Sequence, residues 1–153
     1  VALGSVNGTI KDVIDDMRSH GIRVGSVSIC SFRPFPSAAL FDAIAHVPVV
    51  VTIEKSLSVG IGGNVSHNLR MALHDSKSRV FTVIAGLGGR PITRASLRNV
   101  FKDALDGRLP ALSFLDLNMD VVNRQLDRER AVHRSGPAAE SILKDLGSRP
   151  VRV

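Results

Sequence analysis

Apolar residues along about the first two thirds of the chain follow two alternating patterns. Four short runs resemble strands, and the third of them, residues 47–53, is almost wholly apolar, as in a central strand that is buried on both faces. These runs cover residues 1–6, 23–31, 47–53 and 80–85. Between them, apolar residues recur at helical spacing, first at Ile10, Val13, Ile14 and Met17. The regular alternation of strand and helix predicts an α/β fold, a three-layer domain in which helices cover both faces of a parallel sheet.

The helices expected between these strands have recognisable ends. An Asn7-Gly8 turn precedes the first helix, and Thr9 is suited to cap it. Two more helices are expected over 38–45 and 65–73, and Thr93 is suited to cap a fourth. Right-handed crossovers place the loops that follow parallel strands along one edge of the sheet. We therefore expect any binding surface of the domain at that edge.

A stiff elbow, Phe32-Arg33-Pro34-Phe35-Pro36, follows the second strand. Each Pro fixes its own φ and pushes the residue before it out of the helical region. The chain must therefore leave the strand in an extended form, with two aromatic rings at the turn. Such an elbow either shapes a ligand site or holds two bodies against each other.

Two glycine loops follow the third and fourth strands. Gly60-Ile61-Gly62-Gly63 lacks the last Gly of the dinucleotide-binding pattern, because Val65 occupies its place. Gly86-Leu87-Gly88-Gly89 fails in the same way at Pro91, and neither loop ends like a phosphate-binding P-loop. We interpret these glycines as turn formers, although Arg90 leaves anion binding open.

Glu54 ends the third strand, where open α/β sheets place functional groups. Its alternative roles are an ion pair with Lys55 or Arg33, or hydrogen bonds to loop amides. The five His residues show no metal-ligand spacing with further ligands, and the Gly-x-Ser-x-Gly pattern of a hydrolase nucleophile does not occur. The sequence therefore predicts no catalytic residue and no metal site.

The pattern changes after Gly107. We expect an α/β domain over residues 1–107 and a C-terminal extension over 108–153. The extension has a polar segment with apolar residues at helical spacing, and Pro137 opens a short helix that ends near Gly147. This helical arm either packs on a neighbouring chain or folds back on its own sheet.

Composition is that of a soluble globular protein, with 44% hydrophobic and 22% charged residues. No apolar run approaches the ~20 residues of a membrane-spanning helix, and there is no signal-peptide pattern. The net charge is +6, but the charges are scattered and Tyr and Trp are absent, so nucleic acid is not the expected partner. Cys30 is the only cysteine, and we expect it to be buried. A single cysteine allows no internal disulfide, which fits a cytoplasmic location. A start at Val1 suggests a piece of a longer polypeptide.

Taken in order, these motifs resemble the transketolase C-terminal-like domain of thiamine-dependent enzymes. The resemblance is closest to the second domain of the 2-oxoacid:ferredoxin oxidoreductases, such as pyruvate:ferredoxin oxidoreductase. It rests on four segments, namely residues 8–13, the elbow 32–36, Glu54-Lys55 with 60–63, and 84–90 with Ile92-Thr93. The Gly-Leu-Gly-Gly-Arg stretch that ends at Arg90 favours this group over a transketolase or a 2-oxoacid dehydrogenase.

The resemblance implies an enzyme that oxidatively decarboxylates a 2-oxoacid onto coenzyme A, using thiamine diphosphate and iron–sulfur clusters. In that family the thiamine cofactor lies between a pyrimidine-binding domain and a diphosphate-binding β subunit. A γ subunit and a ferredoxin-like subunit or ferredoxin complete the expected partners. This sequence lacks the Gly-Asp-Gly…Asn run of the β subunit and the repeated Cys-x-x-Cys of cluster proteins. We therefore expect the chain alone to bind no cofactor and to be inactive.

The leading hypothesis is a non-catalytic structural and assembly domain within such a multisubunit enzyme. Its expected interface residues are Phe32, Arg33, Pro34, Phe35, Pro36, Glu54, Gly60, Gly62, Gly63 and Arg90. The alternatives are a free-standing nucleotide- or anion-binding module that uses the glycine loops, and, less favoured, a nucleic-acid-binding protein. Under the leading hypothesis, Phe35→Ala weakens assembly more than it weakens the fold.

Overall fold

The computed structural model describes residues 1–131 of the chain. The chain divides after Asp116 into a sheet unit, residues 1–116, and a second unit that begins at Leu117. The described part of the second unit contains the helix α5 (Met119–Ala131). The short helix predicted over 137–147 lies outside the described residues.

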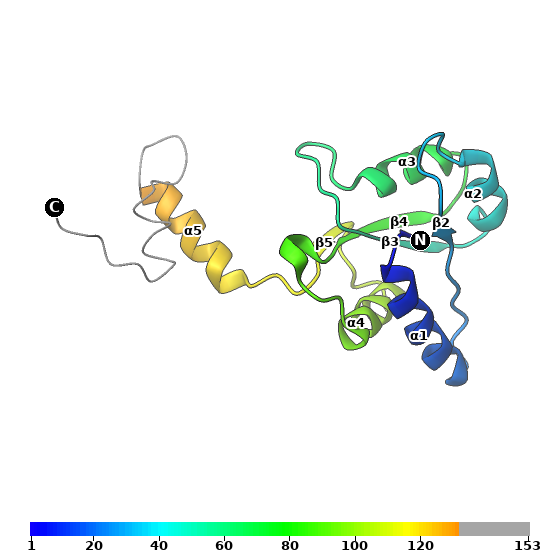
Figure 1. The fold of residues 1–153 in the computed structure, drawn as a ribbon, viewed down its shortest axis with the longest axis horizontal. Helices are drawn as coiled ribbons and strands as arrows, with labels where there is room; N and C mark the ends of the chain where they lie inside the picture. Colours follow the sequence, from blue (N-terminus) through cyan, green and yellow to red (C-terminus); the bar gives the residue numbers. More distant parts are fainter. Residues whose placement is uncertain (132–153) are drawn as a thin grey trace. The chain divides into compact units, whose positions relative to one another are not determined.

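The sheet is parallel, with five strands in the order β2-β1-β3-β4-β5 (Figure 1). The strands are β1 (Ala2–Leu3), β2 (Ser28–Ile29), β3 (Val49–Glu54), β4 (Arg79–Ile84) and β5 (Leu112–Phe114). β3 and β4 pair along their full length. The direction in which strands are added reverses between β1 and β3, and in open α/β sheets such a point marks where ligands meet the carboxyl edge.

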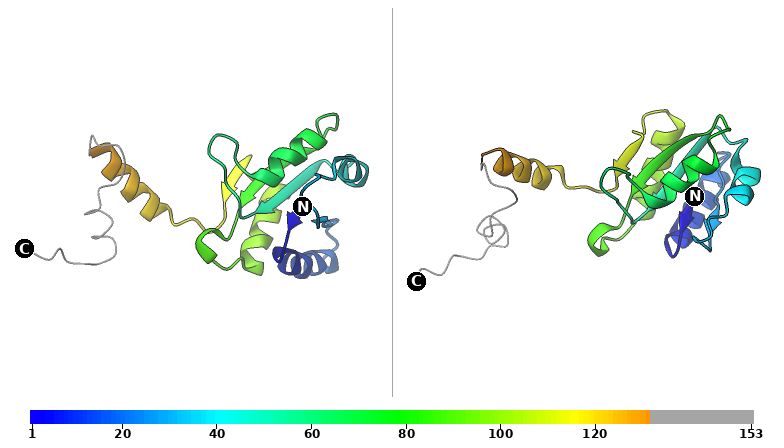
Figure 2. Two further views of the ribbon diagram at one scale, coloured as in Figure 1. Left: turned by 45° about the horizontal axis from the view of Figure 1, so that its top comes forward. Right: turned by 90° about the horizontal axis from the view of Figure 1, so that it is seen from above.

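Helices cover both faces of the sheet, so the predicted three-layer α/β fold is confirmed (Figures 1 and 2). α1 (Val6–Ser19) and α4 (Arg94–Leu105) lie side by side on one face. α2 (Ser37–Ile44) and α3 (Asn64–Ala72) lie together on the other. A short 3-10 turn, η1 (Leu87–Gly89), follows β4.

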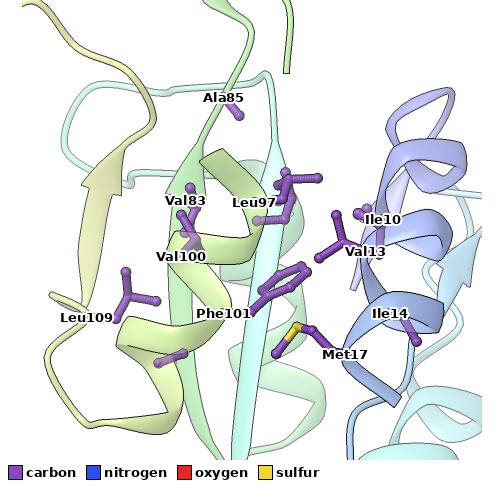
Figure 3. Close-up of a cluster of buried hydrophobic side chains, with 13 residues drawn as sticks. Ile10, Val13, Ile14, Met17, Val83, Ala85, Leu97, Val100, Phe101 and Leu109 are labelled. Atoms are coloured by element: carbon purple, nitrogen blue, oxygen red, sulfur yellow. The ribbon is translucent and has the colours of Figure 1, made fainter. Parts of the chain in front are cut away.

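Two hydrophobic cores hold the layers together, because successive residues of a strand point to opposite faces of the sheet. Ile53 of β3 joins a first core with α1 and α4, in which Phe101 and Met17 face each other (Figure 3). Val50 of the same strand joins a second core with α2 and α3. Each fully buried side chain, such as the 0% exposed Leu69 of α3, contributes about 2–3 kcal/mol.

The end of the sheet unit differs from the expectation. Residues that were assigned to the C-terminal extension form β5, whose Leu112 lies opposite Thr82 and whose Phe114 lies opposite Ile84 of β4. The sheet unit therefore runs nine residues past the expected boundary at Gly107, to Asp116. Within residues 1–131, no helix combines the length and the apolar character that crossing a membrane requires.

Three local predictions near the amino end were wrong. The Asn7-Gly8 pair lies inside α1, which starts at Val6, so neither the turn nor a cap at Thr9 forms there. β2 is two residues long, because most of the apolar run 23–31 is irregular. Cys30 is exposed rather than buried, since it follows the end of that short strand.

Candidate functional site

The loop after β3, residues 55–63, is tied together by its own hydrogen bonds. The Ser58 N–H donates to the Gly62 carbonyl (2.7 Å), and the Gly62 N–H donates back to the Ser58 carbonyl (2.8 Å). Gly60 and Gly62 have φ of 80° and 85°, which a residue with a Cβ rarely adopts. The Ser58 hydroxyl donates to Asn64 Oδ1 (2.9 Å), and the Asn64 amide donates to the Ser56 hydroxyl. The loop is therefore a defined turn in which several backbone and side-chain polar groups are hydrogen-bonded to each other.

Apolar side chains stand outward on this turn. Val59 is 100% exposed, Ile61 is 53% exposed and Leu57 is 42% exposed. Figure 1 shows the loop between β3 and α3 projecting beyond the strands. A hydrogen-bonded turn that presents apolar residues to solvent has the form of a contact surface for another protein.

The loop after β4 lies next to this turn. A Cβ built on Gly86 would come within 2.9 Å of Lys55 Cε, so the Lys55 side chain reaches across from the β3 loop. Leu87, the next residue, is 43% exposed. We call the exposed apolar residues of the two loops the carboxyl-edge surface; they are Leu57, Val59, Ile61 and Leu87.

Glu54 lies beneath the carboxyl-edge surface and is only 6% exposed. Its Oε2 accepts a hydrogen bond from the Val65 N–H (2.8 Å), and its Oε1 accepts one from the Ser66 N–H (3.0 Å). Both donors belong to the first turn of α3, whose N–H groups have no partner within the helix. Of the alternatives for Glu54, hydrogen bonding to backbone amides is the one observed, although the donors lie in α3 and not in the loop, and the ion pairs with Lys55 or Arg33 do not form. The carboxylate is an internal anion at the start of α3.

Gly63 is required by the same arrangement. A Cβ at this position would overlap the Glu54 carboxylate and lie 2.7 Å from the Ser66 hydroxyl. The Ser66 hydroxyl in turn donates to the Gly63 carbonyl (3.1 Å). Gly63 therefore serves the close approach of β3 to α3, and the Val65 and Ser66 amides at the start of α3, which could otherwise face a phosphate, are already occupied.

Arg90 has a structural partner. Its guanidinium donates to the backbone carbonyl of Asp116 (2.9 Å). Asp116 Oδ2 accepts from the Ser96 hydroxyl (2.7 Å), and the Ser96 N–H donates to the hydroxyl of Thr93, which confirms Thr93 as the cap of α4. Arg90 therefore connects the β4 loop to the chain that leaves β5.

The elbow packs on its own domain. Phe32 and Phe35 are half-buried against the second core, with their rings 5.8 Å apart in an edge-to-face arrangement. The Arg33 guanidinium lies 4.0 Å from the centre of the Phe32 ring. Arg33 and Pro34 are exposed, and Pro36 immediately precedes α2. The elbow is thus partly core, and it presents a cation and a proline outward.

The described residues offer no metal-binding group of three or more His, Cys, Asp or Glu side chains. His67 and His74 are both exposed, and the His74 ring pairs with the neighbouring Asp75 (2.9 Å). The sequence interpretation expected the binding surface at this edge of the sheet but named none of the four apolar residues of the carboxyl-edge surface. The sequence indicates this surface in Ser58-Val59-Gly60-Ile61-Gly62, where apolar residues alternate with turn-forming residues and belong to no strand or helix that would bury them.

Comparison with known families gives one match that covers more than half of the chain. A sequence model described as "Pyruvate:ferredoxin oxidoreductase core domain II" matches residues 1–97. The matched part includes the elbow and both glycine loops, and it ends inside α4.

Several curated proteins are similar to the chain. The pyruvate synthase subunit PorA of Thermotoga maritima is 38% identical over 113 residues, which cover 72% of this chain and 29% of the relative. PorA of Methanosarcina barkeri is 33% identical over 129 residues, covering 80% and 32%. The ketoisovalerate oxidoreductase subunit VorA of Pyrococcus furiosus is 30% identical over 105 residues, covering 67% and 27%. The chain spans about 30% of the length of these relatives.

Proposed function

Because the chain belongs to the pyruvate:ferredoxin oxidoreductase family, whose core domain II it matches, we propose that it is a non-catalytic assembly domain of a 2-oxoacid:ferredoxin oxidoreductase. The whole enzyme would oxidatively decarboxylate a 2-oxoacid onto coenzyme A and pass the electrons to iron–sulfur clusters. This chain would contribute by holding other parts of the enzyme in place. The carboxyl-edge surface supports the proposal, since a hydrogen-bonded loop that exposes Val59 completely, with Ile61 and Leu57 beside it, is typical of a contact surface for another protein.

The residues of this chain do not fit the cofactors of such an enzyme. Both carboxylate oxygens of Glu54 accept hydrogen bonds from α3, so this buried acid is not free to act on a thiamine ring. An iron–sulfur cluster needs several thiolates, and Cys30 is the only cysteine of the sequence. Thiamine diphosphate and the clusters would accordingly be bound by other domains or subunits.

The proposed partners are those that the family resemblance implies. A pyrimidine-binding domain and a diphosphate-binding β subunit would hold thiamine diphosphate. A γ subunit and a ferredoxin-like subunit or ferredoxin would complete the assembly. We propose that the carboxyl-edge surface contacts one of these bodies, with the exposed Arg33 of the elbow at its margin.

The alternative, a nucleotide- or anion-binding module, is disfavoured by the position of Glu54. A phosphate at the start of α3 would compete with a carboxylate that already accepts from Val65 and Ser66. Bringing two anions to one helix N-terminus costs free energy instead of yielding it. Calorimetry with nucleotides and with coenzyme A is expected to show no binding by the isolated chain.

The test is co-purification of the chain with the remaining polypeptides of the 2-oxoacid oxidoreductase from its own organism. In the double variant Val59→Ser and Ile61→Ser, two exposed apolar side chains become polar. We expect at least about a tenfold loss of affinity for the partners, since fully burying a Val or Ile side chain contributes about 1.5–3 kcal/mol and 1.4 kcal/mol is about tenfold. The free energy of unfolding of the variant is expected to stay within about 0.5 kcal/mol of that of the parent chain.

A matched control is Met71→Ser on α3, which also replaces an exposed apolar residue, 65% accessible, with Ser. This variant is expected to co-purify like the parent chain. Unchanged co-purification of the double variant would rule out the carboxyl-edge surface as the contact. Turnover of a 2-oxoacid by the isolated chain with thiamine diphosphate would rule out a non-catalytic role.

A further inference from the structure

Within residues 1–131, β5 is an edge strand that pairs only with β4 (Figure 2). The Leu115 N–H donates to the Ile84 carbonyl of β4 (2.8 Å), which fixes the direction in which the backbone groups of β5 point. The N–H and C=O groups of one residue point to the same side of a strand, and the sides alternate along the strand. The backbone groups of Leu112 and Phe114 therefore point away from β4.

The side chains of Leu112 and Phe114 are also partly in solvent, at 43% and 37% exposed. They share one face of the sheet, since alternate residues of a strand point the same way. Edge strands of natural proteins are usually guarded by charged residues or by proline within the strand. The segment Leu112-Ser113-Phe114 contains neither. β5 therefore offers unpaired backbone groups beside apolar side chains, a combination to which an extended peptide can add as a further strand.

A positive charge lies beside this edge on the same face. Arg70 of α3 donates from Nη2 to the Thr82 hydroxyl (2.6 Å) and to the Val80 carbonyl (3.4 Å), both uncharged acceptors. Leu112 lies opposite Thr82, and neighbouring strands are about 4.8 Å apart, so Leu112 is the next side chain beyond Thr82. Arg70 is half-buried, and no carboxylate within residues 1–131 forms an ion pair with it. Its remaining N–H donors can therefore bind a carboxylate, with which a guanidinium makes strong hydrogen bonds.

We propose that the outer edge of β5 binds an extended segment of another polypeptide, which adds as a sixth strand and carries a glutamate opposite Leu112. The outward backbone groups of Leu112 and Phe114 supply the hydrogen bonds of the new ladder. An apolar residue two positions from the glutamate covers Phe114, since it lies on the same face. The acid must be long, because two strand spacings, roughly 10 Å, separate the added strand from β4. Glutamate therefore reaches Arg70 better than aspartate does.

A second copy of this chain is the competing occupant. Two β5 strands could pair antiparallel about a two-fold axis, with Leu112 of one chain opposite Phe114 of the other. The segment Leu112-Ser113-Phe114 carries no acid, however, so Arg70 would stay without a carboxylate in both copies. The charge beside the edge therefore favours a different, acidic strand over a copy of β5.

The test is titration of the full chain with two acetylated and amidated peptides, Val-Thr-Glu-Thr-Val and Val-Thr-Gln-Thr-Val. Each reads the same in both directions, so the middle residue lies opposite Leu112 and a Val lies opposite Phe114 in either strand orientation. NMR follows hydrogen exchange at the Leu112 and Phe114 amides, with the Ser113 amide, which faces β4, as the internal reference. We expect the Glu peptide to bind at least about threefold more tightly than the Gln peptide, because its carboxylate pairs with Arg70. At saturation it should slow exchange at Leu112 and Phe114 at least about fivefold.

Arg70→Gln separates the charge from the rest of the edge. This variant is expected to bind the two peptides with equal affinity, because neither then meets a guanidinium. The matched control is Arg94→Gln on α4, which removes an exposed guanidinium on the other face of the sheet and should keep the preference for the Glu peptide. Phe114→Thr should weaken both peptides alike, because it removes an apolar contact that they share. This pattern distinguishes the pairing of Arg70 from a general effect on the fold.

Equal affinities of the parent chain for the two peptides, or binding of neither at up to about 10 mM, would overturn the proposal. So would Leu112 and Phe114 amides that exchange as slowly as Ser113 in the free chain, because the edge would then already be occupied. Protection that rises with the concentration of the chain, without peptide, would show that a second copy is the occupant and that the stated one is wrong. The measurements use neither the carboxyl-edge surface nor a partner subunit, so they can fail independently of the proposed assembly role.

Discussion

Replacing Glu54 with Gln tests the internal anion at the start of α3. The carboxylate accepts from two amides, Val65 at 2.8 Å and Ser66 at 3.0 Å, and is only 6% exposed. A Gln side chain has one acceptor oxygen and one NH₂ group. One of the two amides must then face another donor in a buried place, while the helix loses its compensating negative charge.

The expected loss follows from these two effects. A hydrogen bond to a charged group contributes about 1.5–3 kcal/mol, and leaving a buried N–H unpaired costs about 1–3 kcal/mol. A charge at a helix N-terminus adds about 0.3–1 kcal/mol. Because these contributions overlap, we expect Glu54→Gln to lower the free energy of unfolding by about 3 kcal/mol. For a unit of this size the melting temperature should fall by more than about 10 °C.

Urea denaturation followed by circular dichroism measures this loss directly. The matched control is Asp42→Asn on α2, which removes an exposed carboxylate by the same chemical change and is expected to alter stability by less than about 0.5 kcal/mol. The loss in Glu54→Gln should persist in 1 M salt, roughly unchanged, because buried interactions are screened little. A loss no larger than that of the control would refute the internal-anion account.

Four further outcomes are expected. Gly63→Ala lowers stability by about 2 kcal/mol in urea, because its Cβ overlaps the Glu54 carboxylate. Thr52→Val raises the free energy of unfolding by about 1 kcal/mol, and with it the melting temperature, since the buried Thr52 hydroxyl has no partner within the described residues. Phe35→Ala costs about 2 kcal/mol because its ring packs on the second core, and a larger loss in co-purification than in folding supports the interface prediction. For a chain that begins at Val1, burial lowers the pKa of the terminal amine from 8.0 to about 6 on folding. Stability is therefore full above about pH 9, lower by about 2 kcal/mol at pH 6 and lower by about 2.7 kcal/mol below pH 5, and an acetylated terminus should abolish this fall.

Much of the fold was predictable because buried faces of strands and helices require apolar residues at regular spacing in the sequence. β3 and β4 are covered on both faces, so their residues form continuous apolar runs. α1 buries Ile10, Val13, Ile14 and Met17 at helical spacing, as expected. The strands that were missed or overestimated are short. β5 is three residues at the sheet edge with two of them exposed, and β2 pairs through two residues.

Side-chain environments were harder to infer, because they depend on contacts distant in sequence. The Val65 and Ser66 N–H groups donate to Glu54, whereas the sequence left a choice between ion pairs and loop amides, because it did not show where α3 begins. Cys30 lies in an apolar run but outside the pairing, and periodicity does not report where a strand stops. The exposure of Val59 depends on the Ser58–Gly62 turn, which only the folded loop reveals.

The central claim, that the chain assembles through its carboxyl-edge surface, is tested most directly by hydrogen–deuterium exchange. The exchange of the free chain is compared with that of the chain assembled with its partner polypeptides. The account predicts protection of residues 57–61 and of Leu87 upon assembly. Protection confined to other surfaces, with these loops exchanging as in the free chain, would contradict it.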